Sequence, residues 1–255
     1  MKRVRMLCAS LGRNLLLAVL ALATLASGVA HAQEQEWEFA AEAYLWGANV
    51  DIETEAGTDT EIRFTDIVDD LQLGGMLALF AHRDKWMFGF DGIYLDIDDN
   101  VEEEVQEGVE LNDLALEAWV VSPMVGYELL QSDRFSLFVM AGARYLWIDV
   151  SEKINFSPPE PVGTENFSTS DGSWDGLIGI RGHWRLSDDW YTTYHLDVGT
   201  GDSGLTWQAL GAFGYRFNRF DAIVGYRYLE WDNTENDALE DLNMSGVMAG
   251  VKFWF

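Results

Sequence analysis

Cysteine, proline and positive charge are scarce in this chain of 255 residues, and each scarcity excludes a class of protein. Cys8 is the only cysteine, and it precedes the apolar part of the amino-terminal segment, whereas a lipoprotein cysteine would follow that part. Beyond this segment the chain has no thiol, so disulfide bridges and thiolate metal sites are excluded. Four prolines beside 48% hydrophobic and 13% aromatic residues are not the composition of a disordered chain.

Basic residues number 16 against 43 acidic ones. Four of the basic residues and none of the acidic ones lie in residues 1–32, so the rest of the chain has 12 basic and 43 acidic residues and a net charge of −31. A surface that binds nucleic acid neutralises phosphates with lysine and arginine. Nucleic acid is therefore excluded as a partner.

Long hydrophobic runs are also missing. The apolar run 15–25 is far shorter than the roughly 20 residues that a membrane-spanning helix needs, and no later run is long enough. Basic residues precede this run, and the small-x-small sequence Ala30-His31-Ala32 follows it. We predict a cleaved secretory signal over 1–32 and one domain over 33–255.

Segments with alternating apolar and polar residues recur along the chain, and no amphipathic helical pattern of comparable length competes with them. They predict about ten strands, at 37–48, 73–83, 86–97, 115–129, 135–150, 174–186, 190–198, 206–217, 220–231 and 244–255. Most have about 11 residues or more, which suits a strand that crosses a membrane better than the five or six residues of a soluble sheet.

The connections between these strands alternate in length. Short ones lie at 84–85, 131–134, 187–189 and 218–219, and long acidic ones at 50–72, 98–113, 151–173 and 232–243. This is the plan of a transmembrane barrel, with short periplasmic turns beside both termini and long acidic extracellular loops. We predict an all-β fold, a transmembrane antiparallel up-and-down β-barrel of about ten strands, within a range of eight to twelve. A soluble periplasmic barrel is the alternative.

The predicted outward faces are apolar, as contact with lipid requires. One face of 135–150 carries Phe135, Leu137, Val139, Ala141, Ala143, Tyr145 and Trp147, and one face of 206–217 carries Trp207, Ala209, Gly211, Phe213, Tyr215 and Phe217. Aromatic residues gather near strand ends, as in interfacial girdles: Trp37, Trp86, Trp119, Tyr127, Trp174, Trp184, Trp190 and Phe220.

The last strand alternates Val247, Ala249, Val251, Phe253 and Phe255 with other residues and ends on an aromatic residue. This ending resembles the terminal signature of bacterial outer-membrane β-barrel proteins. The resemblance implies that Phe253 and Phe255 form an assembly signal, with the barrel-assembly machinery as a partner.

The predicted inward faces are polar, and a Gly-x-Arg motif recurs on them, as at Gly142 to Arg144. Glycine leaves room in a narrow lumen, and the arginines there need anionic partners. We expect ion pairs to cross the lumen and to leave little open bore at this strand number. The residues of this lumen charge network are Glu38, Glu42, Asp91, Glu128, Arg144, Asp175, Arg181, His195, Asp197, Arg216, Asp221 and Arg227.

Two local features depart from a regular barrel. Pro123 falls inside a predicted strand, and a closed barrel has no edge strand to hide the missing N–H, so we expect a bulge or a local break there. Helical spacing, i, i+3, i+4 and i+7, relates the apolar residues Phe64, Ile67, Val68 and Leu71, and Thr65 is a suitable helix cap. They predict about two helical turns, which either narrow the barrel mouth or pack on the other loops.

Several stretches resemble a widespread group of poorly characterised, small porin-like outer-membrane barrel proteins. The stretches are 64–71, 85–86, 93–96, 142–145, 205–209 and 225–229. The resemblance covers most of the chain beyond residue 32 and implies a bacterial outer-membrane location. It implies no reaction, ligand or cofactor.

His195 and Asp197 are the main candidates for chemistry, because a His–Asp pair inside a barrel can serve a hydrolase or an acyl-transfer enzyme. His183 points inward from the neighbouring strand. The alternative is that these residues belong to the lumen hydrogen-bond network. No positioned serine nucleophile is evident from the sequence.

The acidic loops are candidates for weak divalent cation binding, since such cations prefer oxygen ligands and could bridge to lipopolysaccharide phosphates. The carboxylates concerned are Asp98, Asp99, Glu102, Glu103, Glu104, Glu107 and Glu110, with a second cluster over 232–241. Their spacing matches no EF-hand, and a solvated surface is the alternative.

The sequence thus favours a non-enzymatic outer-membrane protein in contact with lipid and lipopolysaccharide. Its role would be structural, or that of a narrow porin-like channel for small solutes. The alternatives are a membrane-embedded hydrolase that uses His195 and Asp197 and a surface adhesin or receptor that acts through the acidic loops.

Overall fold

A computed structural model of the chain describes residues 36–53, 59–62, 71–99, 103–106, 109–156, 163–232 and 241–255. Ten antiparallel strands form the barrel: β1 (Glu38–Glu53), β3 (Leu71–Arg83), β4 (Trp86–Asp99), β6 (Val109–Gln131), β7 (Phe135–Phe156), β8 (Gly163–Arg185), β9 (Trp190–Gly201), β10 (Leu205–Arg216), β11 (Asp221–Asp232) and β12 (Asp241–Trp254). Two short strands, β2 (Asp59–Ile62) and β5 (Glu103–Gln106), pair with β1 and β6. Among the described residues, no helix is long and apolar enough to span a membrane.

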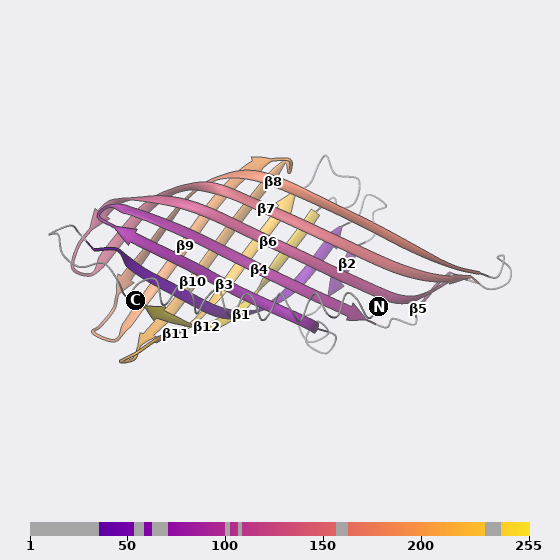
Figure 1. Cartoon of the computed structure of the whole chain (residues 1–255), viewed down its shortest axis with the longest axis horizontal. Coiled ribbons are helices and arrows are strands. Elements are labelled where there is room, and N and C mark those ends of the chain that lie inside the picture. The colour runs from indigo at the N-terminus through magenta and orange to yellow at the C-terminus, as the bar shows by residue number, and fades with distance from the viewer. Residues whose placement is uncertain are drawn as a thin grey trace. The chain divides into compact units, whose positions relative to one another are not determined.

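Each barrel strand pairs with the next one along the chain, and β12 returns to β1 to close the barrel (Figure 1). The closing ladder runs from Ala40↔Trp254 to Glu53↔Asp241. Contacts group Trp37–Trp254 into one compact unit, which is the barrel. The predicted all-β antiparallel barrel of about ten strands is therefore confirmed, and all ten predicted strands are present.

Three strands are much longer than predicted. β6, β7 and β8 have 23, 22 and 23 residues, and their ladders continue to Val109↔Phe156 and Phe156↔Gly163. The prediction that 98–113 and 151–173 are loops was wrong over most of their length. Backbone hydrogen bonds hold these ladders, and their Ser-, Thr- and Asn-rich residues lack the hydrophobic alternation on which the prediction depended.

The long ladders build a sheet that continues past the end of β9. The pairing of β8 with β9 stops at Asp175↔Gly201, whereas the pairing of β8 with β7 continues to Gly163. At about 3.3 Å per residue, residues 163–174 extend roughly 40 Å along the strand direction. We call residues 109–114, 151–156 and 163–168 of β6, β7 and β8, which form the outermost part of these ladders, the β6–β8 extension (Figure 1).

Pro123 interrupts one ladder without a bulge. β6 pairs with β4 through Phe90↔Pro123, but its pairing with β7 passes from Val121↔Tyr145 directly to Met124↔Gly142 with equal spacing on both strands. A Cβ at Gly142 would overlap the carbonyl oxygen of Pro123, so glycine is needed for the close approach of the two strands. The expected local break is present and the expected bulge is not.

Two predictions lie mainly outside the described residues. The signal over 1–32 is one of them. The helix over 64–71 is the other, and its only described member, Leu71, is the first residue of β3. Both stay predictions.

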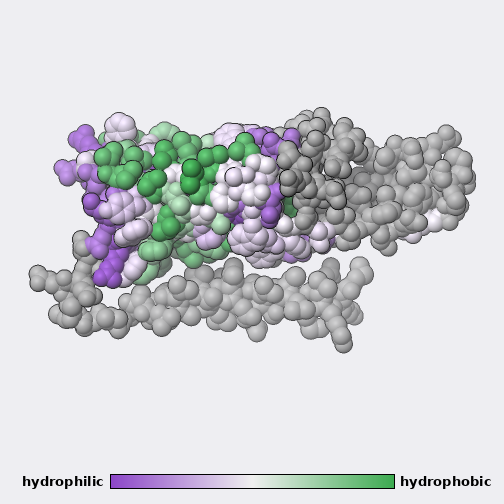
Figure 2. Space-filling view, turned by 90° about the horizontal axis from the view of Figure 1, so that it is seen from above, coloured by the Kyte–Doolittle hydropathy of each residue, from purple (hydrophilic) through white to green (hydrophobic). Residues whose placement is uncertain are grey.

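The outside of the barrel is apolar and rich in aromatic side chains. Exposed side chains include Leu45, Ile178, Phe213, Val224 and Val247, and these five are 51–71% exposed. Figure 2 shows a hydrophobic zone on the visible face of the described part of the barrel, with hydrophilic residues gathered at one end of it.

Aromatic pairs lie at both ends of the strands. Trp86–Tyr127 and Trp190–Tyr215, with ring centroids 5.1 and 4.9 Å apart, lie near the short turns. Tyr145–Trp174, with centroids 4.7 Å apart, lies toward the β6–β8 extension. Two aromatic zones that flank an apolar band are the pattern of a lipid-facing surface.

Candidate functional site in the barrel lumen

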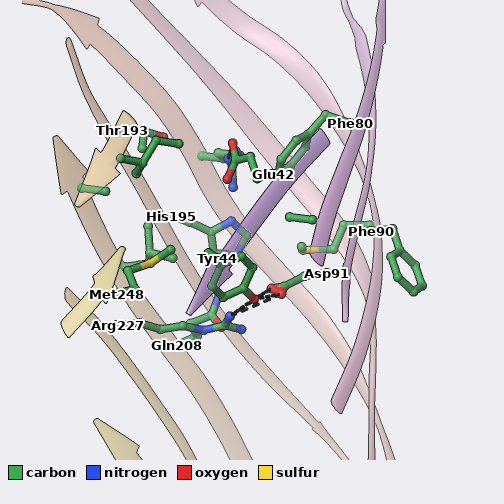
Figure 3. Close-up of a pocket in the computed structure, with 16 residues that line it drawn as sticks. Glu42, Tyr44, Phe80, Phe90, Asp91, Thr193, His195, Gln208, Arg227 and Met248 are labelled. Carbon is green, nitrogen blue, oxygen red and sulfur yellow. Dashed lines mark hydrogen bonds and ion pairs between the residues drawn. The ribbon is translucent and has the colours of Figure 1, made fainter. Parts of the chain in front are cut away.

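Arg227 of β11 is the centre of a hydrogen-bond network across the lumen (Figure 3). It is 1% exposed. Its Nη1 atom lies 3.0 Å from Asp91 Oδ2 and donates to the hydroxyl of Tyr44 at 2.8 Å. Its Nε and Nη2 atoms both donate to Gln208 Oε1, at 2.9 and 2.5 Å. Tyr44 in turn donates to Asp91 Oδ1 at 2.6 Å.

Arg144 of β7 and Asp197 of β9 extend this network. Arg144 Nη2 lies 2.8 Å from Asp197 Oδ1, and Nη1 donates to the hydroxyl of Thr206 at 2.9 Å. Asp197 Oδ2 is 2.6 Å from His195 Nε2 and accepts a bond from Gln208 Nε2 at 3.2 Å. Gln208 therefore joins Asp197 to Arg227, and six residues from four strands form one connected network with the Tyr44–Asp91 pair.

A second ion-pair group lies closer to the short turns. Glu42 Oε1 is 2.8 Å from Lys252 Nζ and 3.9 Å from Arg181 Nη2. Both cations also lie over the ring of Phe80, at 4.2 Å for Arg181 and 5.2 Å for Lys252. One carboxylate and one aromatic face thus hold two cations together.

Toward the long connections, the inward faces of β1, β4, β6, β7, β11 and β12 carry apolar side chains, whereas Asp175 of β8 and Thr206 of β10 are buried polar residues at the same end. The prediction that the inward faces are polar is therefore correct for the turn half and wrong for these six strands at the other end. Leu229 and Trp231 are 0% exposed, and the same cluster contains Trp46, Ala48, Val50, Ile93, Leu95, Val120, Leu146, Ile148, Leu242 and Met244. We call this cluster the apolar plug. Its side chains pack together as in the hydrophobic core of a soluble domain.

The described residues of the lumen line an inner and an outer cavity. The inner one, drawn in Figure 3, has a volume of about 30 Å³, which is space for one or two water molecules. Its lining includes His195 and the Arg227–Asp91 pair. The outer one has a volume of about 970 Å³ and is lined by residues of the β6–β7 and β8–β9 turns. We call it the vestibule. Arg181, Phe80 and Thr193 line both cavities.

The remaining predicted network residues lie in separate places. Asp175 Oδ1 accepts bonds from the backbone and hydroxyl of Ser203, and Asp221 Oδ2 accepts from Tyr191 and Trp254. Three other predicted residues border the vestibule or its rim: Glu38, Glu128 and Arg216. The structure therefore distributes the twelve predicted residues over several groups, of which the Arg227–Arg144 network is the largest.

His183 and the terminal phenylalanines complete the sequence-derived candidates. His183 Nδ1 lies 2.6 Å from the hydroxyl of Ser136 at the vestibule wall. Phe253 is 42% exposed on the outward face of β12, and Phe255, which follows the last residue of β12, is 62% exposed. Their role as an assembly signal stays a prediction. No group of three or more His, Cys, Asp or Glu side chains within the described ranges is arranged to hold a metal ion.

Sequence reasoning missed the uncharged members of the network. Tyr44, Thr206 and Gln208 each satisfy a buried charge, yet they were not predicted as site residues. Their positions in the strands could have identified them, because alternate residues of a strand face the same side. Tyr44 shares the inward face of β1 with Glu42, and Thr206 and Gln208 share one face of β10.

His195 has the geometry of a structural residue. It is 1% exposed, Nε2 bonds to Asp197, and Nδ1 has no hydrogen-bond partner among the described residues. We predict that His195→Ala lowers the free energy of unfolding by about 1–3 kcal/mol, because Asp197 keeps its bonds to Arg144 and Gln208. Urea unfolding in lipid vesicles measures this. Hydrolysis of a nitrophenyl ester that wild-type protein shows and this variant loses would instead support the hydrolase interpretation.

The fold and the lumen together define the class of this protein. A closed antiparallel barrel satisfies its backbone internally, its exterior is apolar between aromatic zones, and its charges face inward. This is a porin-like transmembrane β-barrel, and such barrels belong to the bacterial outer membrane. The architecture and location expected from the sequence are thus confirmed.

No family model and no curated protein matches the chain. Solved structures with a similar fold include Ail, the attachment invasion locus protein of Yersinia pestis, with 12% identity over 87% of this chain and 99% of that one and a TM-score of 0.38. The translocator domain of NalP from Neisseria meningitidis has 13% identity over 97% and 98% and a TM-score of 0.38. The AIDA-I transport unit from Escherichia coli has 10% identity over 93% and 97% and a TM-score of 0.42. At these values the likeness carries no argument about function.

Proposed function

We propose that this protein is a non-enzymatic outer-membrane barrel with a closed lumen, whose role is to anchor the β6–β8 extension at the cell surface. The observation that carries the proposal is the filling of the lumen. Above the Arg227–Arg144 network, the apolar plug contains side chains with no exposed surface, such as Leu229 and Trp231. Thr206 lies opposite Trp231 and is also 0% exposed, so the described side chains at this level leave no exposed surface along which a hydrated solute or ion would pass.

The length of the strands supports the surface role. An even-stranded barrel has both termini and the short turns on the periplasmic side, so the β6–β8 extension projects outside. Roughly 40 Å of ladder beyond β9 is more than the hydrocarbon core of a bilayer requires of a strand. A surface-interaction role through this sheet is therefore favoured over the narrow channel.

The other proposed partners of the protein contact the outer surface of the barrel or its acidic segments. The apolar band contacts lipid, and the outer aromatic zone contacts lipopolysaccharide. The assembly machinery reads the last strand with Phe253 and Phe255. Divalent cations bind weakly at the acidic segments around 98–110, whose side chains lie outside those that the structure describes.

We predict that the protein shows no steady conductance in planar lipid bilayers, even in about 1 M KCl, because the apolar plug excludes water. Single-channel recording after insertion from detergent measures this. Heat-modifiable gel migration of the same preparation confirms that the barrel is folded. Long-lived conductance steps from folded protein would contradict the closed lumen and restore the narrow-channel interpretation.

A further inference from the structure

The vestibule has the dimensions of a ligand site. Its volume of about 970 Å³ lies at the upper end of the range for small-molecule pockets. The short turns at its mouth place it on the periplasmic side of the membrane. The apolar plug and the Arg227–Arg144 network close its far end, so a molecule that enters it from the periplasm leaves by the same route.

Two arginines of the vestibule have no acidic partner. Arg185 at the end of β8 and Arg216 at the end of β10 are exposed, line the vestibule and form no ion pair within 4.0 Å with any described carboxylate. Arg181 and Lys252 of the same cavity, by contrast, are held by Glu42. Unpaired arginines are unexpected in a chain with 43 acidic residues. Their guanidinium groups are available for a ligand carboxylate, which arginine binds with two parallel hydrogen bonds.

Part of the vestibule lining is apolar and aromatic. Met87 and Phe138 belong to a buried cluster on the vestibule side, and Phe80 packs against it. Tyr191 lies near Arg216, with 6.0 Å between the guanidinium carbon and the ring centroid. Such walls bind the apolar body of a ligand while the cations orient its charged end.

Acidic side chains at the rim limit the charge of the ligand. Asp133 lies in the β6–β7 turn, Asp188 and Asp189 lie in the β8–β9 turn, and all three border the vestibule, as do Glu38 and Glu128. They repel a multiply charged anion more strongly than a monoanion. A single carboxylate on an apolar body fits both the free arginines and this acidic surround.

We propose that the vestibule binds an apolar monocarboxylate from the periplasm. Arg185 and Arg216 hold the carboxylate, and Phe138 and Tyr191 contact the ring or chain attached to it. The site goes beyond the anchoring role and does not depend on it. The vestibule can bind a ligand from the periplasm whether or not the lumen behind it conducts.

Phenylacetate tests this proposal in the full-length barrel in lipid nanodiscs, by saturation-transfer NMR and titration calorimetry. Phenylacetamide has the same ring without the charge, and succinate has two charges without a ring. We expect phenylacetate to bind at least tenfold more tightly than either. Empty nanodiscs correct for partition of the ring into lipid. Equal binding of phenylacetate and phenylacetamide, or no binding of phenylacetate at millimolar concentration, would overturn the proposal.

The double variant Arg185→Gln/Arg216→Gln tests the residues. Neither side chain forms an ion pair, so the barrel folds as the wild type does, which heat-modifiable migration verifies. We expect phenylacetate affinity to fall at least tenfold. Arg219→Gln, in the β10–β11 turn and outside the vestibule lining, is the matched control and keeps wild-type affinity. An equal loss in the control variant, or no loss in the double variant, contradicts the assignment.

Discussion

Replacing Arg227 with methionine is expected to lower the free energy of unfolding by about 3–5 kcal/mol, which is the usual effect of removing one partner from a buried ion pair. The guanidinium is 1% exposed and contacts Asp91, Tyr44 and Gln208. Without it, the carboxylate of Asp91 keeps only the Tyr44 hydroxyl, and Gln208 Oε1 loses both donors. Urea unfolding in phosphatidylcholine vesicles, followed by tryptophan fluorescence, measures the change.

Two further variants make this result specific. Arg219→Met removes an exposed arginine from a turn and is expected to change stability by less than about 0.5 kcal/mol. Arg227→Met combined with Asp91→Leu recovers part of the loss, since no unpaired buried charge remains. A single Arg227→Met variant within about 1 kcal/mol of wild type would show that the network does not stabilise the barrel.

The second large effect is expected at the seam that closes the barrel. Gly246 of β12 pairs with Ala48 of β1, and a Cβ at position 246 would overlap the carbonyl oxygen of Gly47. Because the overlapping atom belongs to the backbone, the two strands have to separate to accommodate a methyl group. We expect Gly246→Ala to destabilise the barrel by about 1–3 kcal/mol and to slow its closure. Refolding into vesicles, followed by heat-modifiable migration, measures both.

The matched control for this substitution lies on the outward face of β10. A Cβ at Gly211 meets no atom within 4 Å, so Gly211→Ala tests the loss of a glycine without the overlap. It is expected to leave stability unchanged or to raise it by up to about 1 kcal/mol, because alanine restricts the unfolded chain. If both alanine variants behave alike, the close approach of β1 and β12 is not the cause of the effect.

The apolar–polar alternation of the sequence is sufficient to predict a barrel of ten strands. In a strand the side-chain period is two, so every residue can be assigned to the inside or the outside once the lipid-facing side is known. Arg144, Asp197 and Arg227 were placed inward in this way, and the structure has them there, each at most 6% exposed. The β6–β8 extension was not predicted, because the prediction relied on alternating apolar residues. Backbone hydrogen bonds between the strands, and not an apolar face, hold this part of the sheet together.

Parity gives the face of each residue but not its partners. Tyr44 and Arg227 are 183 positions apart, and they meet because β12 closes on β1 at one particular register. The same closure brings apolar residues of six strands together, β1, β4, β6, β7, β11 and β12, so Trp46, Leu229 and Trp231 become one apolar plug. Whether the lumen is open depends on how these side chains fill a shared volume.

The alternating sequence, with its charge and its aromatic strand ends, was therefore enough to establish a lipid-embedded barrel, because exposure to lipid imposes a rule on each strand separately. The apolar plug, the partners of Arg227 and the absence of a described acidic partner for Arg185 and Arg216 follow only from the folded barrel. They depend on the stagger between strands and on the packing of residues that are distant in the chain, and neither is encoded in the pattern of any single strand.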